Sequence, residues 1–325
     1  MRAVVQDRYG PPEVLRTETI ERPSIGPGDV LVEVRAAGVD RGTLHLLTGL
    51  PYLMRIMGFG FRRPKNRVPG LDVAGVVAAV GASVTRFSVG DEVCGIARGS
   101  FAHYAAAAED KLSHKPATVG FAEAAAMPVS GLTAVQALRG VQAGDRVLVT
   151  GASGGVGSYA VQVAKVMGAE VTGECSTAKV DLVRSLGADR VLDHTRDDFA
   201  AEPARYDVIV DTGGRPSLRR LRRALTRQGR AVIVGGENGG RWTGGRWTGG
   251  FGRQVRAMAL SPFVPQTLIA LTSTEHHADI DRLVELVDAG AVVPALDRTY
   301  PLNQVGDALA HLASGTVRGK LVVVP

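Results

Sequence analysis

The sequence is poor in cysteine and has no long apolar run. Cys94 and Cys175 are the only cysteines among its 325 residues. Two thiols are too few for a disulfide framework or a four-thiolate zinc site, so we expect a reducing compartment. No uninterrupted run of about 18 apolar residues occurs, and the first residues, MRAVVQDRYG, lack an apolar signal core. We therefore expect a cytoplasmic protein that is neither secreted nor membrane-spanning.

An excess of cations raises the question of nucleic-acid binding. The formal net charge is +6 and the pI is near 9.6. Basic density peaks in RPSLRRLRRALTRQGR, residues 215–230, where no aromatic residue is interleaved for base stacking. On a helix, the apolar residues of this stretch would share one face: Leu218, Leu221, Ala224 and Leu225. The pattern predicts a solvated amphipathic helix and no nucleic-acid partner.

A change of pattern near residue 122 divides the chain. Before it, short β-branched runs such as VLVEVRAAGV and DEVCGIA alternate with Gly and Pro turns, which predicts a β-rich domain over 1–122. From 123 to 274, strand and helix patterns alternate, which is typical of a parallel sheet covered on both faces. Residues 275–325 predict a helix, a short strand, a helix and a last strand. The fold class is therefore α/β.

Six strands are expected in the alternating part. They are RVLVTG, EVTGEC, RVLDH, YDVIVDTGG, RAVIVGG and a sixth near QTLIALTS. After the fifth, the unit RWTGG occurs at 241–245 and again at 246–250. Two copies are too few for a repeat fold, and glycine at this density predicts an exposed loop.

Residues 146–169 have the pattern of a strand, a glycine turn and an apolar-faced helix. In the frame G-x-G-x-x-G, the chain has Ala152, Gly154 and Gly157. Glycines there permit a tight turn and close approach of the backbone to a pyrophosphate, while N–H groups at the helix start face the phosphates. We therefore expect a dinucleotide site whose contacts include Ser153, Gly154, Gly155, Val156 and Gly157.

Three long stretches resemble a known family. VLVTGASGGVGSYAVQVAKVMGA, VTGECSTAKVDLVRSLGADRVLDHTRDDF and PGLDVAGVVAAVGASVTRFSVGDEV are similar to the medium-chain dehydrogenase/reductase superfamily, in its zinc-independent quinone-oxidoreductase-like branch. The resemblance covers essentially the whole chain. It implies a GroES-like catalytic domain, a Rossmann cofactor domain, a C-terminal segment that returns to the first domain, and a homodimer.

The resemblance also bears on zinc. Zinc enzymes of the superfamily carry a Cys in the loop that here reads AAGVDRGTLH, and a His-Glu pair where this chain has Leu71 and Asp72. Asp40 takes the place of the Cys. Leucine cannot ligate a metal and the remaining oxygens make a poor zinc site, so we expect no zinc. His45 and His103 are expected to be surface or packing residues.

Without zinc, conjugated acceptors are the sensible substrates. Hydride adds at a carbon remote from oxygen, and modest hydrogen-bond donors can stabilise the resulting enolate or hydroquinone anion. This favours an oxidoreductase that transfers hydride from NAD(P)H to a quinone or an α,β-unsaturated carbonyl. Two alternatives remain: a 2-enoyl-thioester reductase, and a cofactor-binding protein with little catalysis.

The candidate catalytic residues are Tyr52 and Asp40. Tyr52 is either a donor to the acceptor oxygen or an aromatic wall of the pocket. Asp40 either has a raised pKa or orients the nicotinamide ribose or its own loop, and the orienting role is favoured. Thr133 resembles the family's threonine near the nicotinamide and pyrophosphate, although a helix hydroxyl can also bond its own backbone. Gly235 and Gly236 are expected at the nicotinamide end.

The choice between NADPH and NADH depends on the end of the second strand. Glu174 suits the 2′-hydroxyl of NADH and would repel a 2′-phosphate, unless its side chain turns away. The following Ser176, Thr177 and Lys179 suit the phosphate of NADPH. His194 falls where related sequences often have a tyrosine near this ribose. The resemblance favours NADPH, with NADH as the alternative.

Overall fold

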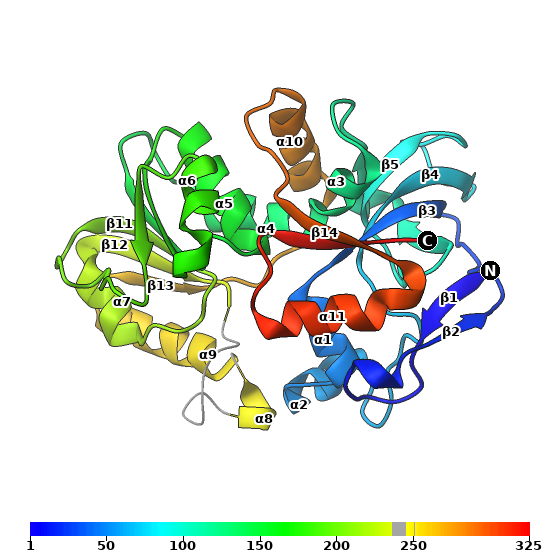
Figure 1. The fold of residues 1–325 in the computed structure, drawn as a ribbon, viewed down its shortest axis with the longest axis horizontal. Coiled ribbons are helices and arrows are strands. Elements are labelled where there is room, and N and C mark those ends of the chain that lie inside the picture. The colour runs from blue at the N-terminus through cyan, green and yellow to red at the C-terminus, as the bar shows by residue number, and fades with distance from the viewer. Residues whose placement is uncertain (236–244, 250) are drawn as a thin grey trace. The chain divides into compact units, whose positions relative to one another are not determined.

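The computed structural model describes residues 1–235, 245–249 and 251–325, and the chain divides into two compact units (Figure 1). The first comprises Met1–Leu132, Thr274–Gly290 and Pro294–Pro325, and the second comprises Thr133–Ser273 and Ala291–Val293. The first unit continues past the boundary expected at residue 122. The reason is packing, because Ala124 and Ala125 lie in one buried cluster with Ala36 and Ala74 of the sheet.

The first unit is built mainly on antiparallel strands, and only β14 and β15 pair in parallel among those named below. Its strands are β1 (Arg2–Val5), β2 (Arg16–Thr19), β3 (Asp29–Val39), β4 (Asp72–Val80), β5 (Glu92–Ile96), β6 (Tyr104–Ala108), β7 (Leu112–His114), β14 (Leu296–Pro301) and β15 (Lys320–Val324). The main sheet has the order β14-β15-β3-β4-β5-β7, with β6 also paired to β3. Strand β15 pairs antiparallel with β3, so the C-terminal segment completes this sheet. The β-rich prediction is confirmed.

Five helices accompany these strands. They are α1 (Arg41–Thr48), α2 (Tyr52–Met54), α3 (Phe121–Ala125), α10 (His277–Asp288) and α11 (Val305–Ser314). Helix α11 buries Ala308 and Leu309 against the valine-rich core of the sheet. Helix α4 (Pro128–Ala137) begins at the proline that interrupts the expected helical stretch, since proline suits a first helical turn. Within the described ranges, no helix is both long and apolar enough to cross a membrane.

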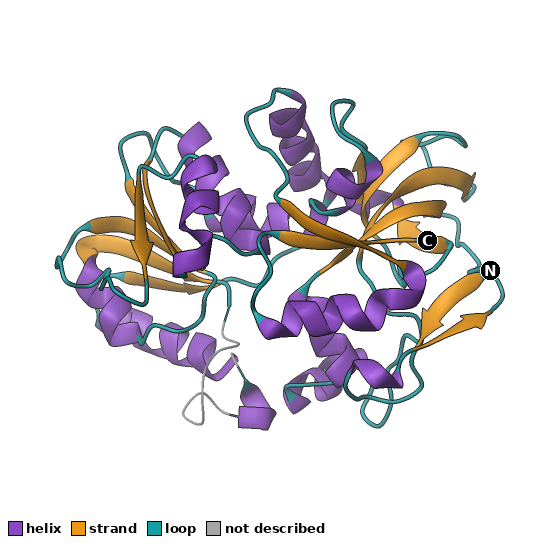
Figure 2. Cartoon of the chain, viewed as in Figure 1, coloured by secondary structure: helices purple, strands orange, loops and turns teal. Residues whose placement is uncertain are grey.

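The second unit is a parallel sheet with helices on both faces (Figure 2). Its strands are β8 (Arg146–Thr150), β9 (Glu170–Cys175), β10 (Arg190–Asp193), β11 (Tyr206–Asp211), β12 (Leu225–Ile233) and β13 (Thr267–Ala270). One face carries α5 (Gly155–Val166) and α6 (Val180–Ser185), and the other carries α7 (Leu218–Ala224) and α9 (Phe251–Leu260). The order β10-β9-β8-β11-β12-β13 confirms the Rossmann prediction and puts the topological switch between β8 and β11.

Two expected segments differ from the structure. The basic helix ends at Ala224, because Leu225 begins β12 and pairs with Tyr206 of β11. Its arginines are mostly exposed, as expected of a solvated face, while Leu221 is buried. In the RWTGG repeat, residues 241–244 and 250 lie outside the described residues. Gly245–Thr248 form a short helix, α8, where a loop was expected, and Trp247 is exposed.

A buried ion pair joins β4 and β15 in the first unit. Lys320 Nζ lies 2.8 Å from Asp72 Oδ2, and both side chains are almost completely buried. The other carboxylate oxygen accepts a hydrogen bond from the Val129 N–H at 2.8 Å. Burial raises the pKa of Asp72 to about 6, while the Lys320 charge opposes this shift. Asp72 thus stands where zinc relatives have a glutamate, and here it is part of a structural contact.

We predict that Lys320→Met lowers the free energy of unfolding by about 3 kcal/mol at pH 8, because it leaves Asp72 buried without its partner. Below the raised pKa of Asp72, near 6, the carboxyl is neutral, so the loss at pH 5 should be smaller. Denaturant unfolding at both pH values measures this. The control is Asp72→Asn combined with Lys320→Met, which removes both charges and should lose less at pH 8. Equal losses at both pH values for the single variant would contradict the account.

Candidate functional site

The glycine turn after β8 is held by close backbone contacts. Gly151 has a φ of +68°, and a Cβ there would lie 2.7 Å from Thr212 Oγ1. A Cβ on Gly157 would overlap the carbonyl oxygen of Gly151. The Ala152 N–H donates to the Glu174 carbonyl at 2.9 Å. The first place of the expected glycine frame is thus a buried alanine, and the left-handed residue is the glycine before it.

Gly154 differs from its neighbours because the fold does not require a glycine there. Its φ of −88° and ψ of 179° are extended, and a Cβ would meet only the Gly151 oxygen, at 3.4 Å. As the N-cap of α5 it offers no side-chain hydrogen bond to the first helical turn. The N–H groups of that turn therefore depend on water or a ligand. The turn fits a pyrophosphate, whose approach a side chain at Gly154 would hinder.

A row of polar side chains follows the carboxyl edge of the parallel sheet. Thr150 on β8 is in register with Glu174 on β9 and with Asp211 on β11, so the three share one face. Asp211 is fully buried, and its Oδ1 accepts from Thr150 Oγ1 at 2.5 Å and from the Gly214 N–H at 3.1 Å.

Asp211 also pairs with Arg253 of α9, which is buried as well. The same guanidinium donates to the Gly235 carbonyl at 3.3 Å. This arrangement ties together the loops that follow β11 and β12, and it supports the backbone at Gly235. Sequence reasoning missed both residues. Asp211 could have been found from the sequence, because it is an acidic residue at the end of an expected strand. Nothing in the sequence pattern distinguishes Arg253. The predicted contact Gly236 lies outside the described residues.

Glu174 lies partly buried in this row. Burial raises its pKa to about 7, the negative charge of Asp211 adds to the rise, and Arg220 and Arg215 oppose it. The carboxyl is therefore partly protonated at neutral pH, so its repulsion of a nearby phosphate is weaker than that of an ordinary glutamate. The neighbouring Cys175 is buried on the opposite face of the strand.

The residues after β9 are brought to those after β10. Thr177 Oγ1 donates to Asp193 Oδ2 at 2.5 Å, so its proton is already used. His194 Nε2 accepts from Arg215 Nη1 at 3.0 Å, which requires the neutral imidazole. Arg215 follows β11 and is exposed, and sequence reasoning missed it. Ser176 and Lys179 are partly buried on the same short segment, at the first turns of the 177–185 helical stretch.

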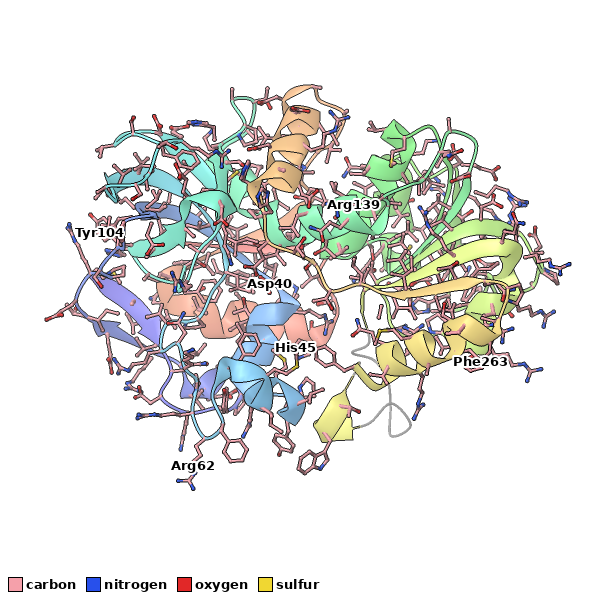
Figure 3. The ribbon with its side chains drawn as sticks, turned by 180° about the vertical axis from the view of Figure 1, so that it is seen from behind. Asp40, His45, Arg62, Tyr104, Arg139 and Phe263 are labelled. Atoms are coloured by element: carbon pink, nitrogen blue, oxygen red, sulfur yellow. The ribbon has the colours of Figure 1, made fainter. Side chains whose placement is uncertain are left out.

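In the first unit, Asp40 begins helix α1 (Figure 3). Its Oδ1 accepts from the Thr43 N–H at 2.7 Å, so the side chain holds its own loop. Its Oδ2 is buried and has no hydrogen-bond partner among the described residues. His45 Nδ1 lies 2.7 Å from the Leu50 carbonyl oxygen, to which it donates, so this ring fastens the end of α1.

Tyr52 is the first residue of α2 and belongs to a packed stack. The Arg55 guanidinium lies 4.8 Å from the centre of its ring and 4.3 Å from that of Tyr9. Arg55 Nε also donates to the Gly49 carbonyl at 2.8 Å, which fixes the cation between the two rings. In the second unit, Thr133 is buried in α4. The roles of Tyr52, Asp40 and Thr133 toward a ligand stay predictions.

The donor set at the superfamily's zinc position does not fit zinc. Leu71 has no donor atom, Asp72 is paired with Lys320, and one oxygen of Asp40 caps a helix. Burial raises the pKa of the Cys94 thiol to about 12, so this thiol is neutral at physiological pH. Across residues 1–235, 245–249 and 251–325, no group of three or more His, Cys, Asp or Glu side chains is placed to hold a metal ion.

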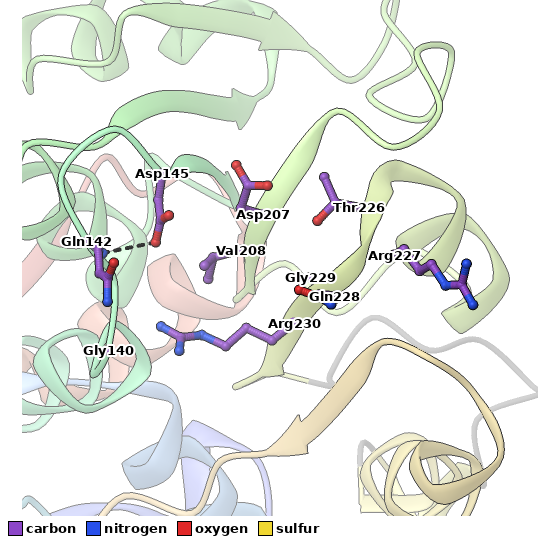
Figure 4. Close-up of a pocket in the computed structure, with 10 residues that line it drawn as sticks. All are labelled: Gly140, Gln142, Asp145, Asp207, Val208, Thr226, Arg227, Gln228, Gly229 and Arg230. Atoms are coloured by element: carbon purple, nitrogen blue, oxygen red, sulfur yellow. Dashed lines mark hydrogen bonds between the residues drawn. The ribbon is translucent and has the colours of Figure 1, made fainter.

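A pocket lies elsewhere in the second unit, at the amino ends of the strands (Figure 4). Asp207 and Val208 of β11 and Thr226 to Arg230 of β12 contribute to its wall. None of the predicted site residues lines it. Ligands of open parallel sheets bind at the carboxyl ends, so we do not assign the cofactor to this pocket.

Comparison with known proteins agrees with this geometry. Residues 26–137 match the family described as "Alcohol dehydrogenase GroES-like domain", and residues 186–323 match the one described as "Zinc-binding dehydrogenase". The chain is 35% identical to the "Chloroplast envelope quinone oxidoreductase homolog" of Arabidopsis thaliana, over 79% of this chain and 80% of that protein. It is 32% identical to the "NADPH-dependent alkenal/one oxidoreductase, chloroplastic" of the same plant, over 100% of this chain and 80% of that protein.

Among solved structures, the quinone oxidoreductase from Coxiella burnetii superposes with a TM-score of 0.85 at 26% identity, covering 100% of this chain and 99% of that one. Its likeness extends over both units. The chain therefore belongs to the medium-chain dehydrogenase/reductase superfamily of NAD(P)H-dependent oxidoreductases, in its quinone-oxidoreductase-like branch.

Proposed function

We propose that this protein transfers hydride from NADPH to a quinone or an α,β-unsaturated carbonyl, without zinc. The observation that carries the proposal is the open backbone at Gly154, a glycine that the fold does not need, at the first turn of α5. The names of the relatives support the substrate class, since one is a quinone oxidoreductase homolog and another acts on alkenals and alkenones. The poor donor set for zinc supports conjugated acceptors.

Several candidate residues have proposed roles. The bound nicotinamide supplies the hydride, and the chain orients it and the acceptor. The N–H groups of Gly155, Val156 and Gly157 hold the pyrophosphate. The buried Oδ2 of Asp40 accepts a hydrogen bond from a ribose hydroxyl, since this oxygen has no hydrogen-bond partner among the described residues. Tyr52 donates to the acceptor oxygen, where negative charge develops.

The preference for NADPH is proposed from the loops after β9, β10 and β11. Ser176 and Lys179 supply a hydroxyl and a cation, and Arg215 adds a second cation held by His194. Thr177 contributes less than the sequence suggested, because it already donates to Asp193. The raised pKa of Glu174 makes the carboxyl compatible with a phosphate near neutral pH.

We further propose that the protein is a cytoplasmic homodimer. The homodimer rests on the resemblance to the superfamily, and light scattering in solution tests it. The location rests on the scarcity of cysteine, which suits a reducing compartment, whereas the names of two relatives place those proteins in chloroplasts or mitochondria.

A panel of cofactor oxidation rates tests the function. We expect NADPH consumption with 1,4-benzoquinone and with an alkenone, and slower rates with acyl thioesters and saturated ketones. A preference for enoyl thioesters would select the 2-enoyl-thioester reductase instead. Failure to oxidise NADPH with any acceptor, together with tight NADPH binding, would select the cofactor-binding protein.

We predict that the same rates persist in excess EDTA and that the purified protein holds no stoichiometric zinc. The reason is that Leu71 has no donor atom and Asp72 is paired with Lys320. Metal analysis by mass spectrometry measures the zinc content. About one tightly bound zinc per chain, with activity lost when it is removed, would refute this part of the proposal.

Glu174 generates a pH prediction. Its raised pKa near 7 means that the carboxyl is mostly neutral at pH 6 and ionised at pH 8. We expect Glu174→Gln to bind NADPH about fivefold more tightly than the wild type at pH 8, and equally at pH 6. Binding of NADH, which lacks the 2′-phosphate, is the matched control and should change less. Isothermal titration at both pH values gives the dissociation constants.

Thermal unfolding of the same variant checks the pKa independently of the cofactor. The folded-state pKa of Glu174 lies above its ordinary value of 4.5, so the folded protein binds more protons than the unfolded chain between about pH 4.5 and 7. The contribution of Glu174 to the free energy of unfolding is therefore fully present below pH 4.5 and is lost as the pH rises through about 7. Glu174→Gln should raise the Tm at pH 8 relative to the wild type. An unchanged or lower Tm at pH 8 would contradict the raised pKa of the buried Glu174 carboxyl.

A further inference from the structure

Four large apolar side chains are exposed within six residues of the first unit. Ile56 is 64% exposed, Met57 60% and Phe61 71%, with Phe59 also exposed. Elsewhere in the described chain, Val255, Met258 and Phe263 are also exposed, but they are spread over nine residues, and single exposed apolar residues are normal for a soluble surface. Exposed apolar side chains that gather on one surface usually mark a contact with something apolar.

The backbone under these side chains is firmly held. The Tyr9 hydroxyl donates to the Phe59 carbonyl at 2.9 Å and lies 2.7 Å from that of Gly60. The Lys65 N–H also donates to the Phe59 carbonyl, at 2.9 Å, which closes the turn. Beneath the turn, Arg55 stacks on Tyr9. The apolar side chains therefore point outward from a supported turn.

Three cations adjoin the apolar group. Arg62, Arg63 and Lys65 are exposed, and Arg62 points away from the ribbon in Figure 3. No ion pair among the described residues involves any of the three. The next cation, Arg67, differs because it pairs with Asp7 and Glu18.

The surrounding sequence contains no acidic residue. Residues 41–71, between Asp40 and Asp72, hold six Lys and Arg side chains and no Asp or Glu. The whole chain has 38 Lys and Arg against 32 Asp and Glu, so the remaining 294 residues are balanced at 32 of each. The excess of positive charge is thus equal to the charge of this one stretch, which a general bias toward arginine does not explain.

We propose that residues 56–65, with their exposed apolar side chains and adjacent unpaired cations, dock this protein on a membrane surface that carries anionic headgroups. The apolar side chains enter the boundary between headgroups and acyl chains, and the cations remain at the level of the phosphates. Ile56 and Met57 favour lipid over nucleic acid, because aliphatic side chains do not stack on bases. The contact is peripheral and reversible.

Flotation with lipid vesicles tests the proposal on the full chain. The probes are vesicles of equal parts phosphatidylglycerol and phosphatidylcholine, and vesicles of phosphatidylcholine alone. We expect binding to the anionic vesicles at 0.1 M salt, at least tenfold weaker binding at 0.5 M salt, and little binding to phosphatidylcholine alone.

Two variants separate the apolar and charged contributions. Ile56→Ser with Phe61→Ser should weaken vesicle binding at least tenfold. Arg62→Gln, Arg63→Gln and Lys65→Gln together should weaken it by about a hundredfold, at about fivefold for each charge. Two matched controls make similar changes elsewhere on the surface. The apolar control is Val89→Ser with Phe263→Ser, both highly exposed. The charge control is Arg219→Gln with Arg223→Gln and Arg227→Gln, in the basic stretch of residues 215–230. Control variants should bind within about twofold of the wild type.

Three results would overturn the proposal. The first is no binding to anionic vesicles, and the second is an equal loss in the matched controls. The third is a different occupant of residues 56–65. A single-stranded oligonucleotide that binds this surface more tightly than the vesicles do would be one such result. A dimer that light scattering shows to dissociate in the Ile56→Ser, Phe61→Ser variant would be another. Tm values of all variants must match that of the wild type within a few degrees, and the single change Phe61→Ser replaces any variant that does not fold.

Discussion

The second unit depends on how closely the first turn of α5 approaches the turn that follows β8. Only a glycine at position 157 avoids overlap with the Gly151 carbonyl, and only a glycine at 151 fits its left-handed backbone beside Thr212. These contacts hold the start of α5 at the switch between β8 and β11. The loop after β9 bonds to the end of β10, His194 after β10 contacts Arg215 after β11, and Arg253 joins the loops after β11 and β12. Most of the proposed cofactor residues come from the turn after β8 and from these loops.

Buried ion pairs join distant elements both at this edge and in the GroES-like unit. Asp211 pairs with Arg253, and Asp72 pairs with Lys320, each between elements that are distant in the sequence. Removing one member of such a pair costs more than removing both, because a lone buried charge is poorly solvated. Glu174 forms no ion pair with another described residue, and burial together with the negative charge of Asp211 raises its pKa.

Much of the fold could be predicted from the sequence, because strand and helix periodicity is local. All six strands of the parallel sheet lie where the alternating pattern placed them, and so do the last helix and strand of the chain. The basic helix was predicted too long because Leu225 fits its apolar face, whereas pairing with β11 draws that residue into β12. Arg253 and Lys320 could not be assigned, since only the tertiary fold brings them to Asp211 and Asp72. Arg215 was read only as part of a solvated face, because its contact with His194 joins two loops.

The central claim is that the fold leaves the backbone at Gly154 open for a dinucleotide. The most direct measurement is the NADPH dissociation constant of Gly154→Ala, with its Tm, compared with Gly157→Ala. A Cβ at 154 meets only ordinary contacts within the protein, so that variant should keep its Tm within a few degrees and lose at least tenfold in NADPH affinity. Gly157→Ala should lose both, since its Cβ overlaps the backbone. NADPH binding that is unchanged in a fully folded Gly154→Ala would contradict the account.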